Sequence, residues 1–422
     1  MLIKRFLDYF RQNKNTTNFY DQKKLIQLRR HVNHLHFRGG WSKKRITREF
    51  GVSKHFVIKW TQSFDQDVTV DLRGWPKGQC RKWDKSTEQR IKMLHKKLAD
   101  DPSEFFTGAT AIAHLWQEEY SEPPPPLRTI GQIKKDLNLT DTRRKVRVKG
   151  ASQYLHYPEF TVYGGYLGNR VMEADFIQRR YLKGKTEPLH FVGFSAKKAP
   201  KVRYFRRIEA LTADIFIHSC ETFFDQFDVP DVLKVDNAAA FSGSQSGKRS
   251  LSQTMIYLLV REITPVFSVP RRPFTQASIE GNNSVFARYF WNKRTFSDLA
   301  DVDRQLEWFN ASSMRYTDYV KPEQPKHKKS FVPKIYFLRQ IHESETTPGQ
   351  GFINVANEEI FLPAVWINFF VLAEWNLQTE NLTVFMEQDK KLNKLTEIQF
   401  TINKTSKKKI NKGVHFYLAF NQ

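Results

Sequence analysis

The first apolar pattern in the chain predicts three short helices close to its start. Apolar residues recur there at intervals of three and four, which places them on one face of a helix. Gly39 and Gly40 end the first helix, and Gly51 supplies a left-handed turn position. Ser42 and Ser53 can cap the second and third helices, because a serine oxygen accepts from the free N–H groups of a first helical turn. The inward residues are Leu25, Leu28, Val32, Leu35, Ile46, Phe50, Val57 and Trp60.

A helix, a glycine-containing turn and a capped helix form the helix-turn-helix pattern. We assign it to residues 21–66, after a tail of residues 1–20. Lys54, His55 and Lys59 then lie on the outer face of the last helix, where a DNA-reading helix meets bases and phosphates. A plain three-helix bundle is the alternative.

A second helical unit with the same pattern is predicted over residues 85–140. A run of four prolines interrupts it, because proline cannot continue a helix. We expect Arg128 and Lys134 to be exposed and to contact DNA. The predicted helices cover residues 85–98, 110–120 and 129–137.

Two linkers flank this second unit. In residues 67–84, Arg73 and Lys77 lie beside glycines, which suits a minor groove, although an ordinary linker is equally consistent. Residues 141–165 are either a basic arm that follows DNA phosphates or a solvated run of charge. The arginines of this arm are Arg143, Arg144 and Arg147.

From residue 166 the periodicity changes to that of strands. Three strands are followed by a helix, a strand, a helix and a strand, which is an α/β order with a mixed five-stranded sheet. The run 232–235 suits the middle of a sheet that is covered on both faces. We assign this core to residues 166–322. The predicted elements are 170–177, 190–194, 202–205, 212–227, 232–235, 255–262 and 265–269.

Residues 323–422 are predicted to form a small C-terminal β domain. A linker rich in proline and lysine is followed by short alternating runs, which is typical of a small barrel or sandwich. A basic segment near residue 407 suggests a module that contacts DNA or joins protomers. A purely structural cap is the alternative.

The charge adds a class of partner. The chain has 68 basic and 44 acidic residues and a net charge of +24, and residues 1–150 alone hold 32 basic and 16 acidic residues. A basic N-terminal third predicts a module that binds a polyanion, against the alternative of a generally lysine-rich proteome. The mean hydropathy of −0.58 argues against a membrane protein. Two cysteines form no disulfide framework and fit a reducing compartment.

Three carboxylates in the central domain are candidates for metal chemistry. Asp175 lies on the first strand, Asp236 ends the 232–235 strand, and Glu280 begins a helix. Oxygen ligands of this kind suit Mg²⁺, and two such ions can assist an in-line phosphoryl displacement. A solvated loop acid is the alternative at each position. Glu173 shares a strand face with Asp175, where it either supports the site or pairs with a local arginine.

The residues around these acids resemble those of transposases of bacterial insertion sequences, whose integrase catalytic core is related to retroviral integrases. The resemblance extends over the two helical units and the C-terminal β region. The resembling segments are Glu173-Ala174-Asp175-Phe176, Val235-Asp236-Asn237 with Phe241, Arg271-Arg272-Pro273 through Ile279-Glu280, Trp308-Phe309-Asn310, and Arg315-Tyr316.

The resemblance implies a ribonuclease-H-like fold with Asp175, Asp236 and Glu280 as the catalytic triad. It implies two Mg²⁺ or Mn²⁺ ions on these acids, and DNA cleavage followed by strand transfer at terminal inverted repeats. Arg288 follows the third acid by about two helical turns and is a further expected DNA contact. The implied partner is double-stranded DNA, bound by a homodimer or a larger homo-oligomer. The implied location is the bacterial cytoplasm, close to the nucleoid, with no membrane association.

Two other functions remain open from the sequence. A domesticated transposase could bind DNA as a repressor or architectural protein without cutting it. A nuclease could hydrolyse DNA without joining it. Metal-dependent strand transfer distinguishes both from a transposase.

Overall fold

The computed structural model describes residues 22–69, 83–140, 170–197, 200–243, 247–317, 319–321, 331–388 and 391–407. They fall into two compact units, Met1–Asp84 and Lys85–Gln422, which we describe separately. The predicted tail of residues 1–20 lies outside the described residues. The same holds for the linker residues Arg73, Lys77, Arg143, Arg144 and Arg147.

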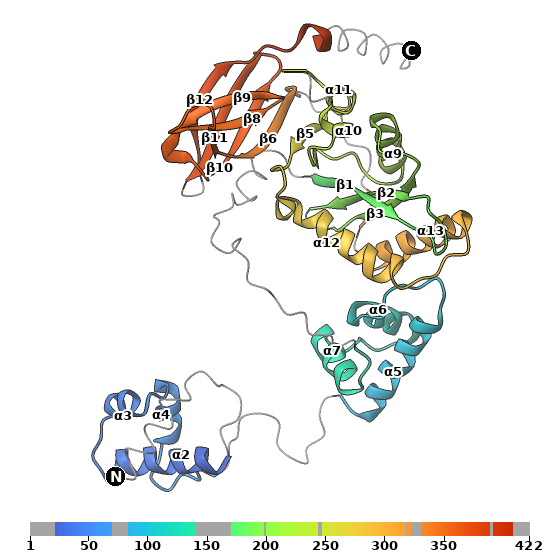
Figure 1. Cartoon of the computed structure of the whole chain (residues 1–422). Coiled ribbons are helices and arrows are strands. Elements are labelled where there is room, and N and C mark those ends of the chain that lie inside the picture. Colours follow the sequence, from blue (N-terminus) through green and yellow to red (C-terminus); the bar gives the residue numbers. More distant parts are fainter. Residues whose placement is uncertain are drawn as a thin grey trace. The chain divides into compact units, whose positions relative to one another are not determined.

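The described residues of the first unit contain three helices that end where the sequence predicts. Ser42 Oγ accepts a hydrogen bond from Arg45 N at 3.2 Å, and Ser53 Oγ accepts one from Phe56 N at 3.1 Å. Gly51 has a φ of 61°, in the left-handed region. The structure thus confirms both serine caps and the glycine turn. The helices are α2 (Gln22–Phe37), α3 (Lys43–Phe50) and α4 (Lys54–Trp60) (Figure 1).

The second unit begins with three more helices around a small apolar core of their own (Figure 1). Trp116 is buried at the centre of this core, and its indole N–H donates to Glu122 O at 3.1 Å. The helices are α5 (Lys85–Asp100), α6 (Ala109–Glu119) and α7 (Leu127–Asp136).

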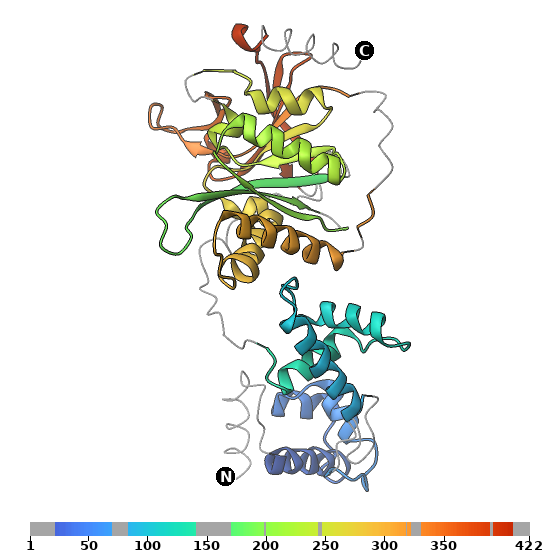
Figure 2. The same ribbon diagram turned by 90° about the vertical axis from the view of Figure 1, so that its right-hand side faces the viewer.

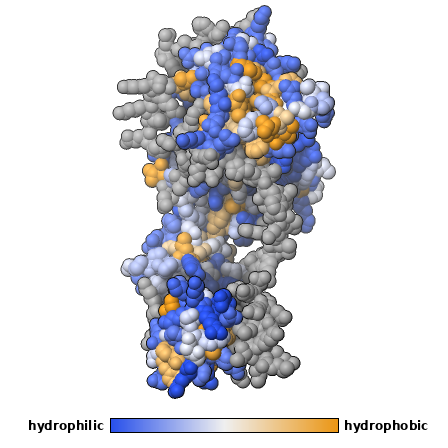
Figure 3. Space-filling model, turned by 90° about the vertical axis from the view of Figure 1, so that its left-hand side faces the viewer, coloured by the Kyte–Doolittle hydropathy of each residue, from blue (hydrophilic) through white to orange (hydrophobic). Residues whose placement is uncertain are grey.

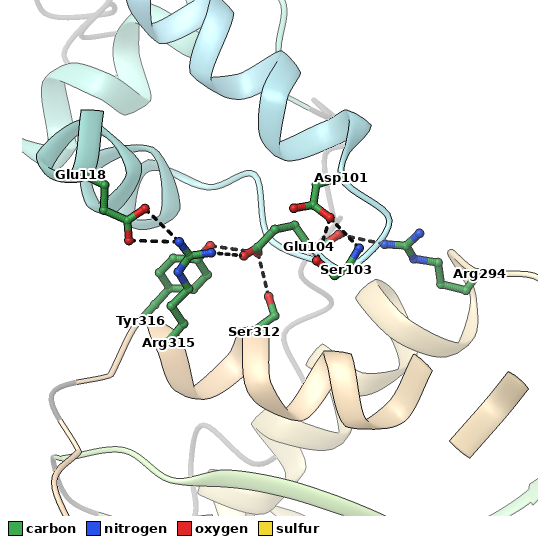
Figure 4. A network of polar contacts seen from close by, with 8 residues as sticks. All are labelled: Asp101, Ser103, Glu104, Glu118, Arg294, Ser312, Arg315 and Tyr316. Carbon is green, nitrogen blue, oxygen red and sulfur yellow. Dashed lines mark hydrogen bonds and ion pairs between the residues drawn. The ribbon is translucent and has the colours of Figure 1, made fainter. Parts of the chain in front are cut away.

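A buried carboxylate joins these three helices to α13 (Leu299–Arg315) in the rest of the unit. Glu104 accepts hydrogen bonds from Ser312 Oγ at 2.8 Å, from Arg315 Nη1 at 2.7 Å and from Tyr316 OH at 2.9 Å (Figure 4). Arg315 also holds Glu118 of α6 through Nη2, at 2.9 and 3.0 Å. The helical segment is therefore attached to the core by a charged network as well as by apolar packing.

A single nine-stranded sheet runs through the second unit. Its strands are β1 (Val171–Arg180), β2 (Leu189–Ala196), β3 (Arg203–Ile208), β4 (Val232–Val235), β5 (Thr264–Phe267), β6 (Lys334–Gln340), β10 (Phe370–Asn376), β11 (Asn381–Gln388) and β12 (Lys391–Gln399). Their order is β12-β11-β10-β6-β5-β4-β1-β2-β3. Strands β1, β2 and β3 are antiparallel neighbours, whereas β1, β4 and β5 are parallel neighbours. The five strands expected for the core are all present and form a mixed sheet.

Helices cover both faces of this core sheet (Figure 2). Successive residues of β1 belong to different apolar clusters. Phe176 lies in the cluster of Phe216 of α9, and Ile177 lies in the cluster of Phe286 and Phe309. This is the period of two that a strand imposes on its side chains. The helices of the first face are α9 (Ala213–Gln226) and α11 (Gln253–Val260), and those of the second are α12 (Ala277–Val285) and α13.

The C-terminal strands continue the core sheet instead of forming a separate barrel. Strand β6 pairs in parallel with β5, with Val266 opposite Tyr336 and Phe267 opposite Phe337. A three-stranded sheet of β7 (His342–Glu343), β8 (Gln350–Val355) and β9 (Glu358–Pro363) accompanies it. The expected barrel-like domain is corrected in this respect, because β6 pairs with β5 of the α/β core on one side and with β10 on the other.

Apolar side chains gather among hydrophilic ones on the face shown in Figure 3. Exposed large apolar side chains of the C-terminal strands and their connections are Phe361, Val365 and Phe369. Of the helices that the structure describes, none combines the length and the apolar character needed to cross a membrane.

Candidate active site

The three predicted carboxylates lie together at one edge of the sheet. Strands β1 and β4 are parallel neighbours, with Glu173 opposite Lys234, so Asp175 in the middle of β1 lies level with the carboxyl end of β4. Asp175 lies on β1, Asp236 directly follows β4, and Glu280 lies in the first turn of α12. All three line one cavity of about 380 Å³.

The walls of this cavity come from the segment between β5 and α12. Arg271 and Arg272 lie in that segment, so two cations face three carboxylates in one cavity. Arg272 Nη2 donates to Gln340 Oε1 at 3.1 Å, so the segment is bonded to the end of β6. The remaining lining residues are Asn237, Ser268, Val269, Pro270 and Gln276.

A glycine lets α12 approach the sheet closely enough to bring Glu280 to the cavity. Gly193 of β2 is the register partner of Asp175. A Cβ atom on Gly193 would lie 2.9 Å from the ring of Phe205 and 3.2 Å from Ile279 Cδ1. A side chain at this position would therefore crowd Phe205 of β3 and Ile279 of α12.

Asp175 has the most perturbed acidity of the three. Burial, followed by the negative charges of Asp236 and Glu280, raises its pKa from 3.8 to about 7. Its Oδ1 accepts from Phe176 N at 2.8 Å, and its Oδ2 accepts from Asn283 Nδ2 at 2.9 Å. These two hydrogen bonds act in the opposite direction but do not cancel the effect of burial and like charge.

The other two carboxyl groups are shifted in the same direction. Burial raises the pKa of Asp236, against the hydrogen bond that Ala238 N donates to its Oδ1 at 2.8 Å. Burial, and then the charge of Glu173, raise the pKa of Glu280. Three acids that resist ionisation in one cavity form a site that a cation would stabilise.

The donor set fits a hard divalent cation by its chemistry. All three groups offer carboxylate oxygens, which Mg²⁺ and Mn²⁺ prefer, and a cation would relieve the repulsion that raises the pKa of Asp175. Within the described ranges, no three His, Cys, Asp or Glu side chains are grouped closely enough to hold a metal ion as they stand. The carboxylates therefore share a cavity without forming a closed ligand cage.

A buried ion pair lies behind the site. Glu173 Oε2 accepts from Ile279 N in the first turn of α12 at 3.0 Å, and its Oε1 lies 3.9 Å from Lys234 Nζ. Burial lowers the pKa of Lys234 to about 8, and its ammonium donates to Thr275 O. Glu173 therefore supports the site by fixing the helix that carries Glu280. Its ion-pair partner is a lysine and not the arginine that we considered.

The basic residues predicted to bind DNA lie in different environments. Lys54, His55 and Arg128 are exposed, and Lys59 is partly buried against the ring of Trp60, with Nζ 5.0 Å from the ring centroid. The predicted contacts of these residues with DNA stay a prediction.

The structure contradicts the predicted exposure of Lys134. Its side chain is buried and donates to Thr107 O, and burial lowers its pKa. It sits on the apolar side of α7 with Ile130 and Ile133, so its charge is directed into the protein. Arg288 is exposed on the π-helical turn Phe286–Trp291, where Nε donates to Ser284 O at 3.2 Å, and it does not line the cavity.

Several polar residues of the site were not found from the sequence. Asn283 follows Glu280 by three residues and therefore shares its helix face, which is a signal that spacing could have given. Gln276 is buried in the cavity wall, and its Nε2 has no hydrogen-bond partner among the described residues. Arg339 reaches Asn237 from β6, a strand of the C-terminal region that was not predicted from the sequence.

Comparisons with known proteins return structural likenesses alone. No protein-family model matches the chain, and no curated protein matches it. The catalytic core domain of BIV integrase is similar over 34% of this chain and 83% of its own, with 15% identity and a TM-score of 0.26. A simian T-cell lymphotropic virus intasome in complex with a PP2A regulatory subunit is similar over 66% of this chain and 96% of its own, with 12% identity and a TM-score of 0.30. At these scores the functional argument rests on the site itself.

Proposed function

We propose that this chain is a DNA transposase or integrase with a ribonuclease-H-like core, which cuts a DNA strand and joins it to another. The observation that carries the proposal is the meeting of Asp175, Asp236 and Glu280 in one cavity, from two parallel strands and a helix. The strand order β5-β4-β1-β2-β3, with helices on both faces, supports the assignment of the core.

The three carboxylates would hold Mg²⁺ or Mn²⁺, with two ions in the complete site. Such ions, when bound, assist phosphoryl transfer by activating the attacking oxygen and stabilising the leaving oxygen. The protein's own contribution is to hold Asp175 in a buried position where its carboxylate gains most from a nearby cation. Arg271 and Arg272 line the same cavity and would contact the phosphates on either side of the cleaved bond.

The helical units supply the proposed DNA contacts. In the first unit, α4 begins with exposed Lys54 and His55, in the position of a recognition helix. In the second unit, Arg128 is exposed in the first turn of α7. These elements would recognise the terminal inverted repeats. Because two DNA ends must be held together for joining, we propose at least a homodimer on DNA in the bacterial cytoplasm.

A strand-transfer assay on DNA fragments that carry candidate inverted repeats from beside the gene tests the proposal. We expect joined products with Mn²⁺ and none with EDTA. Asp236→Asn should lower their yield at least about 100-fold, because it removes one of the proposed ligand charges. Asp225→Asn is the matched control, since Asp225 is an exposed acid of α9 outside the cavity.

Each failure has its own meaning. Cleaved but never joined DNA would identify a nuclease. Wild-type protein that binds the ends and leaves them intact under all metal conditions would identify a binding protein. Equal yields from the Asp236→Asn and Asp225→Asn variants would show that the cavity is not the active site.

A further inference from the structure

Arg339 connects four separate segments of the chain beside the cavity. Its guanidinium donates to Asn237 Oδ1 at 2.9 Å, to Ser268 O at 3.1 Å, to Leu338 O at 2.8 Å and to Asn354 O at 2.6 Å. These acceptors follow β4, follow β5, and lie within β6 and β8 respectively. One side chain from the C-terminal region thus holds the ends of β4 and β5, whose following residues line the cavity.

The environment of Arg339 is unusual for a cation. The side chain is buried, no carboxylate among the described residues pairs with it, and burial lowers its pKa to about 9. An unpaired buried charge is costly unless hydrogen bonds replace its hydration. Arginine suits the position because its planar group presents five N–H donors in fixed directions, whereas lysine presents a single point of charge.

The contact with Asn237 reaches the second carboxylate of the cavity. Asn237 directly follows Asp236, and its side-chain amide is held at both ends. Its Oδ1 accepts from Arg339, and its Nδ2 donates to Ser268 O at 2.7 Å. Ser268 N in turn donates to Val235 O at 2.9 Å, which closes the connection on the residue before Asp236.

We infer that Arg339 is a positioning residue for Asp236, so that the C-terminal strands form part of the catalytic core and are not a separate module. The inference rests on the proposed function. Arg339 acts through Asn237 and does not line the cavity, so it sets the place of the Asp236 carboxylate without touching DNA. The residue before Arg339 pairs with β10, so its place depends on the folded C-terminal strands.

A second arginine offers a matched control, because it joins the same two regions without reaching Asn237. Arg249 follows the segment after Asp236 and pairs with Glu358 of β9, with Nη2 2.7 Å from Oε1. Its Nη1 donates to Thr401 Oγ1 at 3.2 Å. Arg249→Met and Arg339→Met remove the same charge from the junction, but only the second frees Asn237.

The test measures strand cleavage with the full-length protein and Mn²⁺. Removing a partner that orients a metal ligand costs about 10- to 100-fold in activity or metal affinity. We therefore expect Arg339→Met and Asn237→Ala to lower kcat by about that factor, with the KM for DNA within about twofold of the wild-type value. Arg249→Met should keep kcat within about twofold. The double variant of Arg339 and Asn237 should be no slower than the slower single variant, because both changes remove one connection.

Binding of Mn²⁺ in the absence of DNA, followed by electron paramagnetic resonance, gives a readout apart from activity. Arg339→Met should weaken it about tenfold. Should Arg339→Met fail to fold by circular dichroism, Asn237→Ala decides the matter, because it leaves the other three hydrogen bonds of Arg339 in place. If the wild type is active and Asn237→Ala has the same kcat and Mn²⁺ affinity as Arg249→Met, this inference alone is overturned. Wild-type protein with neither cleavage nor Mn²⁺ binding would overturn the proposed function as well.

Discussion

Replacing Asp175 by asparagine should stabilise the metal-free protein at alkaline pH. The carboxyl group has a pKa of about 7 in the folded chain, against an ordinary value of 3.8, because it is buried beside Asp236 and Glu280. Folding therefore opposes its ionisation. An uncharged residue of nearly the same shape removes that penalty.

The pH window and the magnitude follow from these two values. Between pH 3.8 and about 7 the folded state keeps a proton that the unfolded state has lost, so the free energy of unfolding falls as pH rises. Below pH 3.8 the carboxyl group is protonated in both states and does not lower the free energy of unfolding, whereas above about pH 7 the full penalty applies. At about 1.4 kcal/mol for each tenfold change in proton affinity, the penalty has an upper limit of about 4 kcal/mol. Partial exposure of Asp175 reduces the expected gain of the asparagine variant to about 2 to 4 kcal/mol.

The surroundings of Asp175 can accept asparagine without a larger number of unsatisfied buried groups. Phe176 N can still donate to the side-chain oxygen. The amide nitrogen needs an acceptor, and Asn283 can supply one by turning over its own amide. Asn283 Oδ1 is buried and has no hydrogen-bond partner among the described residues, so the turn exchanges one unpartnered buried atom, the oxygen, for another, the nitrogen.

Urea unfolding in EDTA at pH 5 and at pH 8 measures the effect. We expect the stability difference between Asp175→Asn and the wild type to be large at pH 8 and less than half as large at pH 5. Added Mg²⁺ should stabilise the wild type and leave the variant unchanged. Asp225→Asn controls for a general charge effect. A variant that is less stable than the wild type at pH 8, or a difference independent of pH, would refute this reasoning.

Three further predictions concern other parts of the molecule. Gln276→Met should stabilise the fold by about 1 kcal/mol in thermal denaturation, because it removes a buried amide nitrogen without a partner; a loss of stability would contradict this. Lys134→Met should keep the DNA affinity in a filter-binding titration within about twofold of the wild-type value. Lys135→Met, on the exposed side of the same helix, should lower the affinity and its salt dependence. The reverse order would show that Lys134 contacts DNA. Glu104→Gln should cost about 2 kcal/mol in urea unfolding, discounted for the partial exposure of Arg315, and an unchanged midpoint would show that the network adds no stability.

Local signals in the sequence were sufficient for much of the fold. The serine caps and the turn glycine of the first unit depend on neighbours within four residues, so the sequence contains all of the information. The strand 232–235 was recognisable because four buried residues in a row need cover on both faces. Asp175, in the middle of β1, and Asp236, directly after the parallel neighbour β4, then lie side by side, because Glu173 is paired with Lys234.

The strand β6 could not be recognised in the same way. Its sequence, Lys-Ile-Tyr-Phe-Leu-Arg-Gln, follows a proline-rich and lysine-rich stretch and carries a charge near its end. Its place is set by pairing with β5 and β10, which lie far away in the chain. The prediction of a separate barrel followed from missing this one strand.

The error at Lys134 has a different cause, because the sequence did contain the answer. Ile130, Ile133 and Leu137 define the apolar face of α7, and position 134 is one helical turn after Ile130. Position 134 therefore lies on the same face as Ile130 and Leu137, because residues three and four apart are neighbours on a helix. Charge was given more weight than periodicity, and periodicity was the better guide.

Two buried cations beside the site, Lys234 and Arg339, show what charge and burial together predict. Lys234 lies within Val232–Val235, and Arg339 lies in β6 among buried neighbours. A cation in a strand that is covered on both faces cannot reach water, so it must replace its hydration with fixed oxygens. Lys234 is bonded to Glu173 and Thr275 O, and Arg339 donates to Asn237 Oδ1 and to three backbone oxygens. A lysine or arginine inside an apolar strand run therefore predicts fixed oxygen partners, even where, as for Arg339 and Asn237, the two residues are 102 positions apart.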